Sequence, residues 1–304
     1  MNRSVIAAAA VTAVSAFIAL PAAAGGDDGT AGATFFAASL NGANEVPAAG
    51  GDRDGSAVAF LEVDGDEVSF AVEYHGIAAP VAGDLHQGVK GANGNVKISF
   101  FAFKQPDGRT SVTGTVRVRD QRLLDELKAN PGDFYVDLHT GEFPDGAVRG
   151  QVHKLTSTID MKRALLQNFK ASVIRGAQIY ACTKQVDGTF AFTQDNVSAS
   201  LQHGIAHFFA KAGPAGPPEW RAADRSAVTG TVLTRTPNGA GNIAELDIAA
   251  TQVGRPEGLL AGTDEILRLN TVGGVAPTGK CDPATQPTVA VPYRADYLFV
   301  HAIG

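Results

Sequence analysis

The feature that most constrains the fold is a series of short, alternating, strand-like runs separated by turn residues. Residues 56–76 read SAVAFLEVDGDEVSFAVEYHG, two alternating runs joined by Asp-Gly at 64–65. Asp-Gly accepts the positive φ of a tight hairpin turn, and the period of two is that of a strand with one buried face. Similar runs at 34–40 and 95–118, the latter turning at 106–108, predict another strand and another hairpin.

One segment of the first half departs from this pattern. Residues 120–133, DQRLLDELKANPGD, place Asp120 as an N-cap before a leucine-rich face and end on Asn-Pro-Gly, which predicts a short helix. Strands at 133–140 and 147–155 follow. Antiparallel strands without long helices between them favour a Greek-key sandwich or barrel. We therefore predict an all-β domain over residues 33–154 with one short helix.

The second half is also rich in strand signals. A polar, partly helical linker over residues 155–172 precedes a second β-rich domain, residues 173–304. This domain begins with a hairpin in QIYACTKQVDGTFAFTQ, residues 178–194. No convincing repeat relates the two halves, so we expect two unlike domains.

The N-terminus predicts export. An arginine at position 3, an apolar run over residues 5–20 and alanines at 22 and 24 predict a signal peptide, residues 1–24, cleaved between Ala24 and Gly25. Residues 25–32 then form a flexible N-terminus. No later segment approaches the roughly 20 apolar residues of a membrane-spanning helix, so we expect a secreted, extracellular protein.

Charge and cysteine content indicate which partners to exclude and what state the cysteines take. The chain has 25 Lys+Arg against 31 Asp+Glu and no basic patch, which argues against a nucleic-acid partner. Its two cysteines, Cys182 and Cys281, are most simply one disulfide in an oxidising compartment. A reactive thiol pair is the alternative, although the two lack a C-x-x-C spacing.

Four motifs in the first half occur together in a known family. NGANEVPAAG, LHQGVKGANGNV, RLLDELKANPGDFYVDLHT and FPDGAVRGQV resemble the chordin-type CHRD domain. The resemblance implies an extracellular β-sandwich, with a topology related to copper/zinc superoxide dismutase. In animal chordin such domains belong to a growth-factor-binding protein. The family commonly carries His-Ile-His where this chain has Asp84-Leu85-His86.

The second half resembles an extracellular domain family of unknown function. The resemblance rests on RGAQIYACTK, GIAHFFAKAGPAGPPEW, DRSAVTGTV, EILRLNTVGGVAP and CDPATQPTVAVPYRADYLFV. Both cysteines lie within these motifs, which supports a bridge between Cys182 and Cys281. The resemblance implies no chemistry.

Strand parity places four candidate ligands on one face. Alternate side chains of a strand share a face, so Asp84 and His86 lie opposite Leu85, and Asp137 and His139 lie opposite the apolar residues of 134–138. If the strands are neighbours, these four side chains form a polar, water-facing cluster together with an arginine at position 149.

Two interpretations compete for this cluster. Two imidazoles and two carboxylates are a ligand set for zinc. They could also hold copper, although such a copper site would have fewer nitrogen ligands than usual. The alternative is a hydrogen-bonded network in which Arg149 neutralises the aspartates and no cofactor is held. A fixed cation beside a divalent ion is unfavourable, so Arg149 argues for the network.

No complete catalytic motif is present, and the remaining candidates are weak. His203 and His207 lack the glutamate of the helical zinc-protease motif. Trp220 follows GPAGPPE and is expected on a surface loop. We therefore predict a non-enzymatic secreted binding or structural protein that recognises an extracellular protein or polysaccharide. The alternative is a redox or metal-scavenging protein that holds zinc or copper at Asp84, His86, Asp137 and His139.

Overall fold

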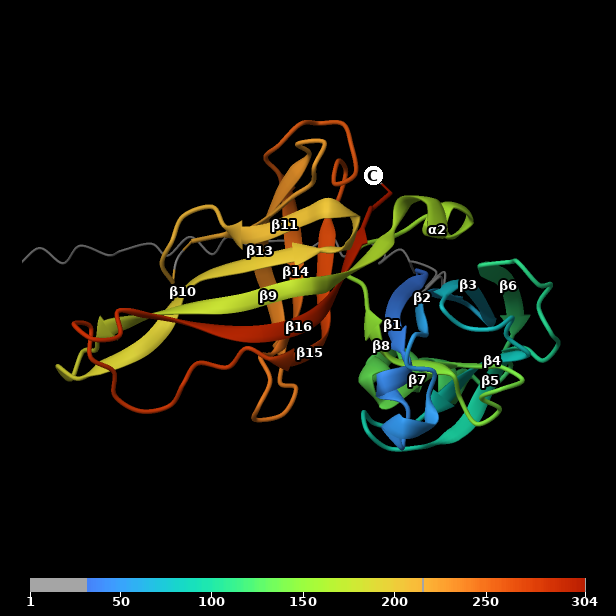
Figure 1. The fold of residues 1–304 in the computed structure, drawn as a ribbon. Coiled ribbons are helices and arrows are strands. Elements are labelled where there is room, and N and C mark those ends of the chain that lie inside the picture. Colours follow the sequence, from blue (N-terminus) through green and yellow to red (C-terminus); the bar gives the residue numbers. More distant parts are fainter. Residues whose placement is uncertain (1–31, 215, 304) are drawn as a thin grey trace, which may run out of the picture. The chain divides into compact units, whose positions relative to one another are not determined.

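The computed structural model describes residues 32–214 and 216–303, which form two eight-stranded sheets joined by short helical turns (Figure 1). The predicted signal peptide, its cleavage site and residues 25–31 lie outside the described residues. The prediction of an all-β chain with two β-rich parts is confirmed.

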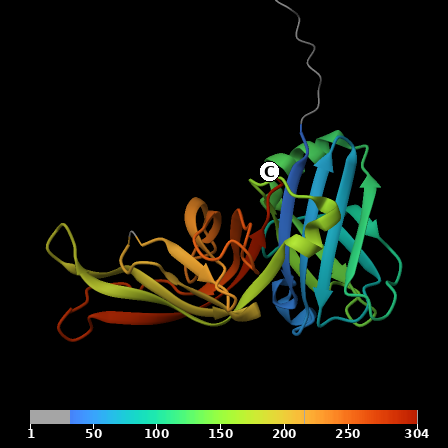
Figure 2. The same cartoon turned by 90° about the horizontal axis from the view of Figure 1, so that it is seen from above.

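Strands β1–β8 form the first sheet, named here the N-terminal sheet. Its order is β5-β4-β7-β8-β1-β2-β3-β6, and Figure 2 shows its strands side by side in blue to green. Its strands are β1 (Thr34–Asn41), β2 (Ser56–Asp64), β3 (Glu67–His75), β4 (Ala82–Gln87), β5 (Asn95–Phe101), β6 (Ser111–Arg117), β7 (Phe134–His139) and β8 (Val148–Lys154).

The N-terminal sheet curls around one apolar core, to which all eight strands contribute side chains. Phe70 of β3 stacks on Phe100 of β5 with ring centroids 4.9 Å apart, although these strands lie near opposite ends of the sheet order. The hairpin predicted at residues 64–65 is present, with every residue of β2 paired to β3.

The hairpin predicted between residues 95 and 118 is wrong. Strand β5 pairs with β4 and strand β6 pairs with β3, so the two lie at opposite edges of the sheet. The Pro-Asp-Gly turn at 106–108 does reverse the chain, but β6 then continues along the free edge of β3. A turn determines direction locally, whereas the partner of a strand depends on which edge is available.

The predicted helix is confirmed as α1 (Gln121–Ala129). The Asp120 side chain accepts a hydrogen bond from the Leu123 backbone N–H at 3.2 Å, and Leu124 and Leu127 are fully buried. A second short helix, α2 (Ala164–Gln167), lies in the connection between the two sheets. Within the described ranges, no helix has both the length and the apolar content needed to cross a bilayer.

Strands β9–β16 close into an eight-stranded barrel, named here the C-terminal barrel. Its strands are β9 (Phe169–Lys184), β10 (Phe190–Leu201), β11 (Ile205–Phe209), β12 (Pro218–Arg221), β13 (Ala227–Thr236), β14 (Glu245–Gln252), β15 (Glu265–Gly273) and β16 (Thr288–Val300). The predicted disulfide is present, because Cys182 of β9 is bonded to Cys281 before β16 with Cα atoms 5.8 Å apart.

The connection after β8 is more apolar in its packing than its polar sequence indicates. Leu155, Ile159 and Ala164 are buried against the outer face of β1 and β2 and against barrel residues such as Leu267 and Leu298. Strand β1 is therefore buried on both faces, which explains why alternation of burial is absent along it.

Candidate metal centre

Strands β4 and β7 bring three of the predicted ligands together. They pair antiparallel, with Asp84 opposite Asp137 and Ala82 opposite His139. The intervening Leu85 and Leu138 are fully buried in the apolar core, so Asp84, His86 and His139 project from the other face of the sheet.

This face is not open to water, and the expectation of a water-facing cluster is wrong. Only 8 % of His86 and 3 % of Asp137 is accessible to solvent. The loop at residues 88–94 covers them, because the Arg149 guanidinium donates to the carbonyl of Ala92 at 2.7 Å and to the Asn93 amide oxygen at 2.8 Å. The alternation along a strand determines on which face of the sheet a side chain lies. Whether that face is exposed to solvent depends here on the loop at residues 88–94.

Both histidines are held in one tautomer by backbone carbonyls. The Nδ1 atom of His86 lies 3.0 Å from the carbonyl oxygen of Gly94, and Nδ1 of His139 lies 3.0 Å from that of Pro144. A carbonyl oxygen only accepts, so each Nδ1 carries a hydrogen and donates it. The lone pair for a ligand bond is therefore on Nε2 of each ring.

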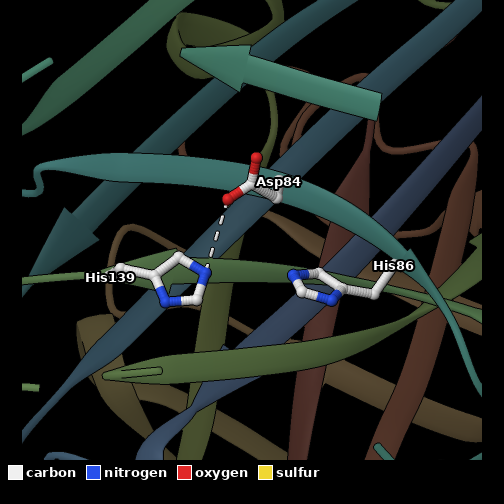
Figure 3. Close-up of side chains that lie close together, drawn as sticks. All are labelled: Asp84, His86 and His139. Carbon is white, nitrogen blue, oxygen red and sulfur yellow. Dashed lines mark ion pairs between the residues drawn. The ribbon is translucent and has the colours of Figure 1, made fainter. Parts of the chain in front are cut away.

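The two Nε2 atoms face one another and the Asp84 carboxylate (Figure 3). The ligand atoms of Asp84, His86 and His139 lie within 4.8 Å of one another. Nε2 of His139 is 3.4 Å from an Asp84 oxygen. Nε2 of His86 is buried and has no hydrogen-bond partner among the described residues.

A glycine and a tyrosine position His86. The imidazole stacks on Tyr135 with ring centroids 4.8 Å apart. A Cβ atom on Gly94 would lie 1.6 Å from the carbonyl oxygen of Gln87, so only glycine lets this backbone approach β4 and accept from His86. Burial lowers the pKa of His86, which favours the neutral imidazole that a metal requires.

Asp137, the fourth predicted ligand, lies outside this group. Burial, together with the adjacent Glu45, raises the pKa of Asp137 to about 9, and burial raises that of Glu45 to about 7. Glu45 Oε1 and Asp137 Oδ1 are both buried without a hydrogen-bond partner among the described residues, and the guanidinium of the nearby Arg149 lies 3.6 Å from the centre of the Tyr135 ring. Among the described residues the Arg149 guanidinium donates to the loop at 88–94 and forms no ion pair with Asp84 or Asp137, so the predicted neutralisation of the aspartates by direct pairing with Arg149 is not seen.

Glu45 was not identified as a site residue from the sequence. It lies in the NGANEVPAAG motif, before β2, and no strand parity relates it to β4 or β7. The one sequence signal for Glu45 was its position in the NGANEVPAAG motif, which resembles the CHRD domain. The approach of this loop to β7 is a tertiary feature.

The histidines of the C-terminal barrel do not form a ligand pair. His203 is exposed, whereas His207 is buried and stacks on Trp220 with ring centroids 4.3 Å apart. Trp220 lies on β12 and is 1 % exposed, so its expected position on a surface loop is wrong. The Pro-rich segment before it ends where the strand begins.

Comparison with known families confirms the two resemblances inferred from the sequence. Residues 36–152 match the CHRD domain, and residues 192–301 match the family described as Protein of unknown function (DUF3455). No curated protein and no solved structure matches the chain.

Proposed function

We propose that this chain, a CHRD domain followed by a DUF3455 region, is an exported, non-enzymatic binding protein whose CHRD domain holds one divalent transition-metal ion. The ligands are Nε2 of His86, Nε2 of His139 and a carboxylate oxygen of Asp84. The CHRD domain and the disulfide support export. Recognition of an extracellular protein or polysaccharide by exposed strands and loops is the broader role proposed for the same chain.

One observation carries the metal proposal. Both imidazoles donate Nδ1–H to backbone carbonyls and direct Nε2 to a common point beside a carboxylate. Metal-binding histidines characteristically use the second ring nitrogen in this way, because the hydrogen bond fixes both the tautomer and the ring orientation. A purely structural network gives no reason for a buried Nε2 of His86 without a partner.

The distances favour a small tetrahedral site. Two ligand atoms about 2.1 Å from a tetrahedral zinc ion are about 3.4 Å apart. The distance between Nε2 of His139 and the Asp84 oxygen is 3.4 Å. Nε2 of His86 lies within 4.8 Å of these two atoms, so the three side chains would supply three ligands to one ion. Two imidazoles with one carboxylate suit zinc, and copper is the second choice.

The test is metal binding by protein purified without a histidine tag. Isothermal titration with zinc sulfate, and separately with copper sulfate, is expected to give one ion per chain. His86→Ala and His139→Ala should each raise Kd by about 100-fold or more, because loss of a direct ligand exceeds the effect of losing an outer hydrogen bond. Asp84→Asn should weaken metal binding while leaving the His86 ring stacked on Tyr135.

His75→Ala is the matched control. His75 lies on β3 of the same sheet, its side chain is 62 % exposed, and its substitution should leave the titration unchanged. Absence of stoichiometric binding by the native protein, or equal affinities for native protein, His86→Ala and His139→Ala, overturns the proposal. Circular dichroism of each variant distinguishes loss of a ligand from loss of the fold.

A further inference from the structure

We propose that the C-terminal barrel is a receptor for a small aromatic carboxylate, bound in the barrel interior with its anionic group on Arg268. This site is independent of the metal centre in the N-terminal sheet. Its parts are a cavity, an aromatic wall, a guanidinium that forms no ion pair within the described ranges, and buried donors without partners.

The barrel encloses enough space for such a molecule. A cavity of about 690 Å³ is lined by side chains of the barrel strands and by loop residues 214, 216–217 and 275–276. An eight-stranded barrel either fills its interior with side chains or leaves room for one small ligand, and pockets of 300 to 1,000 Å³ are typical of ligand sites. This barrel is of the second kind.

Aromatic rings form a closely packed wall behind one side of the cavity, and Trp220, His207 and Tyr297 are each at most 3 % exposed. Trp220 and His207 are cross-strand partners on β12 and β11 and stack almost parallel, with 4° between their planes. Tyr297 packs edge-on against both rings. Gly230 lies beside them, where a Cβ atom would come within 2.9 Å of the Trp220 ring, so the wall is closely packed and rigid.

The charge of the cavity is positive. Arg268 and Arg235 line it, and no aspartate or glutamate does so among the described residues. Arg268 is half-buried on β15, and its Nε and Nη2 both donate to the carbonyl oxygen of Ala244 at 3.2 and 2.8 Å. Within residues 32–214 and 216–303 its guanidinium forms no ion pair with a carboxylate, and the hydroxyl of Tyr297 is a polar neighbour of this side chain.

Two neutral donors in the lining are also unused. Trp220 Nε1 and Gln178 Nε2 are buried and have no hydrogen-bond partner among the described residues. Buried donors are rarely left unpaired, so they indicate an acceptor supplied from outside the chain. Burial lowers the pKa of His207 to about 3, which keeps this side chain neutral beside Arg268 and leaves its Nε2 as an acceptor.

These groups together select the ligand. The partly buried apolar side chains of the lining, Phe209, Val232 and Ile243, suit a small apolar body, and a planar carboxylate matches the fork of a guanidinium better than a neutral or cationic group does. A cationic ligand is excluded because the lining has no counter-charge.

The experiment compares two probes of equal shape. Isothermal titration of the full chain with 2-naphthoate should show one saturable site, and the neutral isostere 2-naphthamide should bind about tenfold to 100-fold more weakly because it forms no ion pair. Arg268→Met should reduce the affinity for 2-naphthoate by a similar factor. It should leave the weaker binding of 2-naphthamide nearly unchanged.

Arg294→Met is the control, since Arg294 is exposed on β16 and does not line the cavity. Fluorescence of Trp220, the single tryptophan, reports whether each variant retains a folded barrel. Absence of saturable 2-naphthoate binding, or equal affinity of native protein for the two probes, overturns the proposal. So does unchanged 2-naphthoate affinity in folded Arg268→Met.

Discussion

The buried His207 makes the C-terminal barrel sensitive to mild acid, and the size of the effect follows from its environment. His207 is 3 % exposed, stacked between Trp220 and the edge of Tyr297, with the Arg268 charge nearby. Burial and, to a lesser extent, Arg268 lower its pKa to about 3, despite the opposing hydrogen bond to the Glu219 carbonyl.

The sign of the pH dependence follows from proton uptake. Above pH 6.5 the imidazole is neutral in both states, so the lowered pKa has no effect on stability. Between pH 6.5 and about 3 the unfolded chain binds a proton that the folded barrel excludes, and the barrel loses stability as the pH falls. At about 1.4 kcal/mol per pH unit, the loss between pH 7 and pH 5 is about 2 kcal/mol.

The assay is urea unfolding followed by the fluorescence of Trp220, which lies inside the barrel. His207→Asn retains a donor for the Glu219 carbonyl but does not titrate. This variant is expected to be less stable than native protein at pH 7, and the difference should shrink by about 2 kcal/mol at pH 5. Effects of other histidines cancel in the comparison. A difference that is the same at both pH values, within about 0.5 kcal/mol, would refute the account of burial given above.

Two further predictions concern covalent and polar links. Replacing both Cys182 and Cys281 by serine should destabilise the barrel by up to about 4 to 5 kcal/mol, because their separation of 99 residues closes a long loop in the unfolded chain; an unchanged Trp220 unfolding midpoint would contradict this. Asp296→Ala should cost about 3 to 5 kcal/mol, because the carboxylate accepts four hydrogen bonds and faces the buried Lys170; calorimetry showing a loss below about 1 kcal/mol would refute it.

Short-range patterns along the chain account for the elements that were predicted correctly. The turn at residues 64–65 and the cap at Asp120 depend on neighbours within a few positions, so their sequences suffice to specify them. The disulfide followed from there being two cysteines. Strand parity likewise placed Asp84, His86 and His139 on one face, because the period of a strand is independent of its partners.

Contacts between segments distant in the chain decided the strand pairing, the burial of the histidine face and the composition of the ligand group. β5 and β6 pair with different strands because the edges of β4 and β3 were free, which no local turn encodes. The loop at residues 88–94 buries the histidine face, and the approach of Glu45 removes Asp137 from the ligand group. By itself, the sequence determined which side chains share a face. The tertiary structure alone decided what lies above that face, because solvent exposure and charge pairing depend on segments distant in the chain.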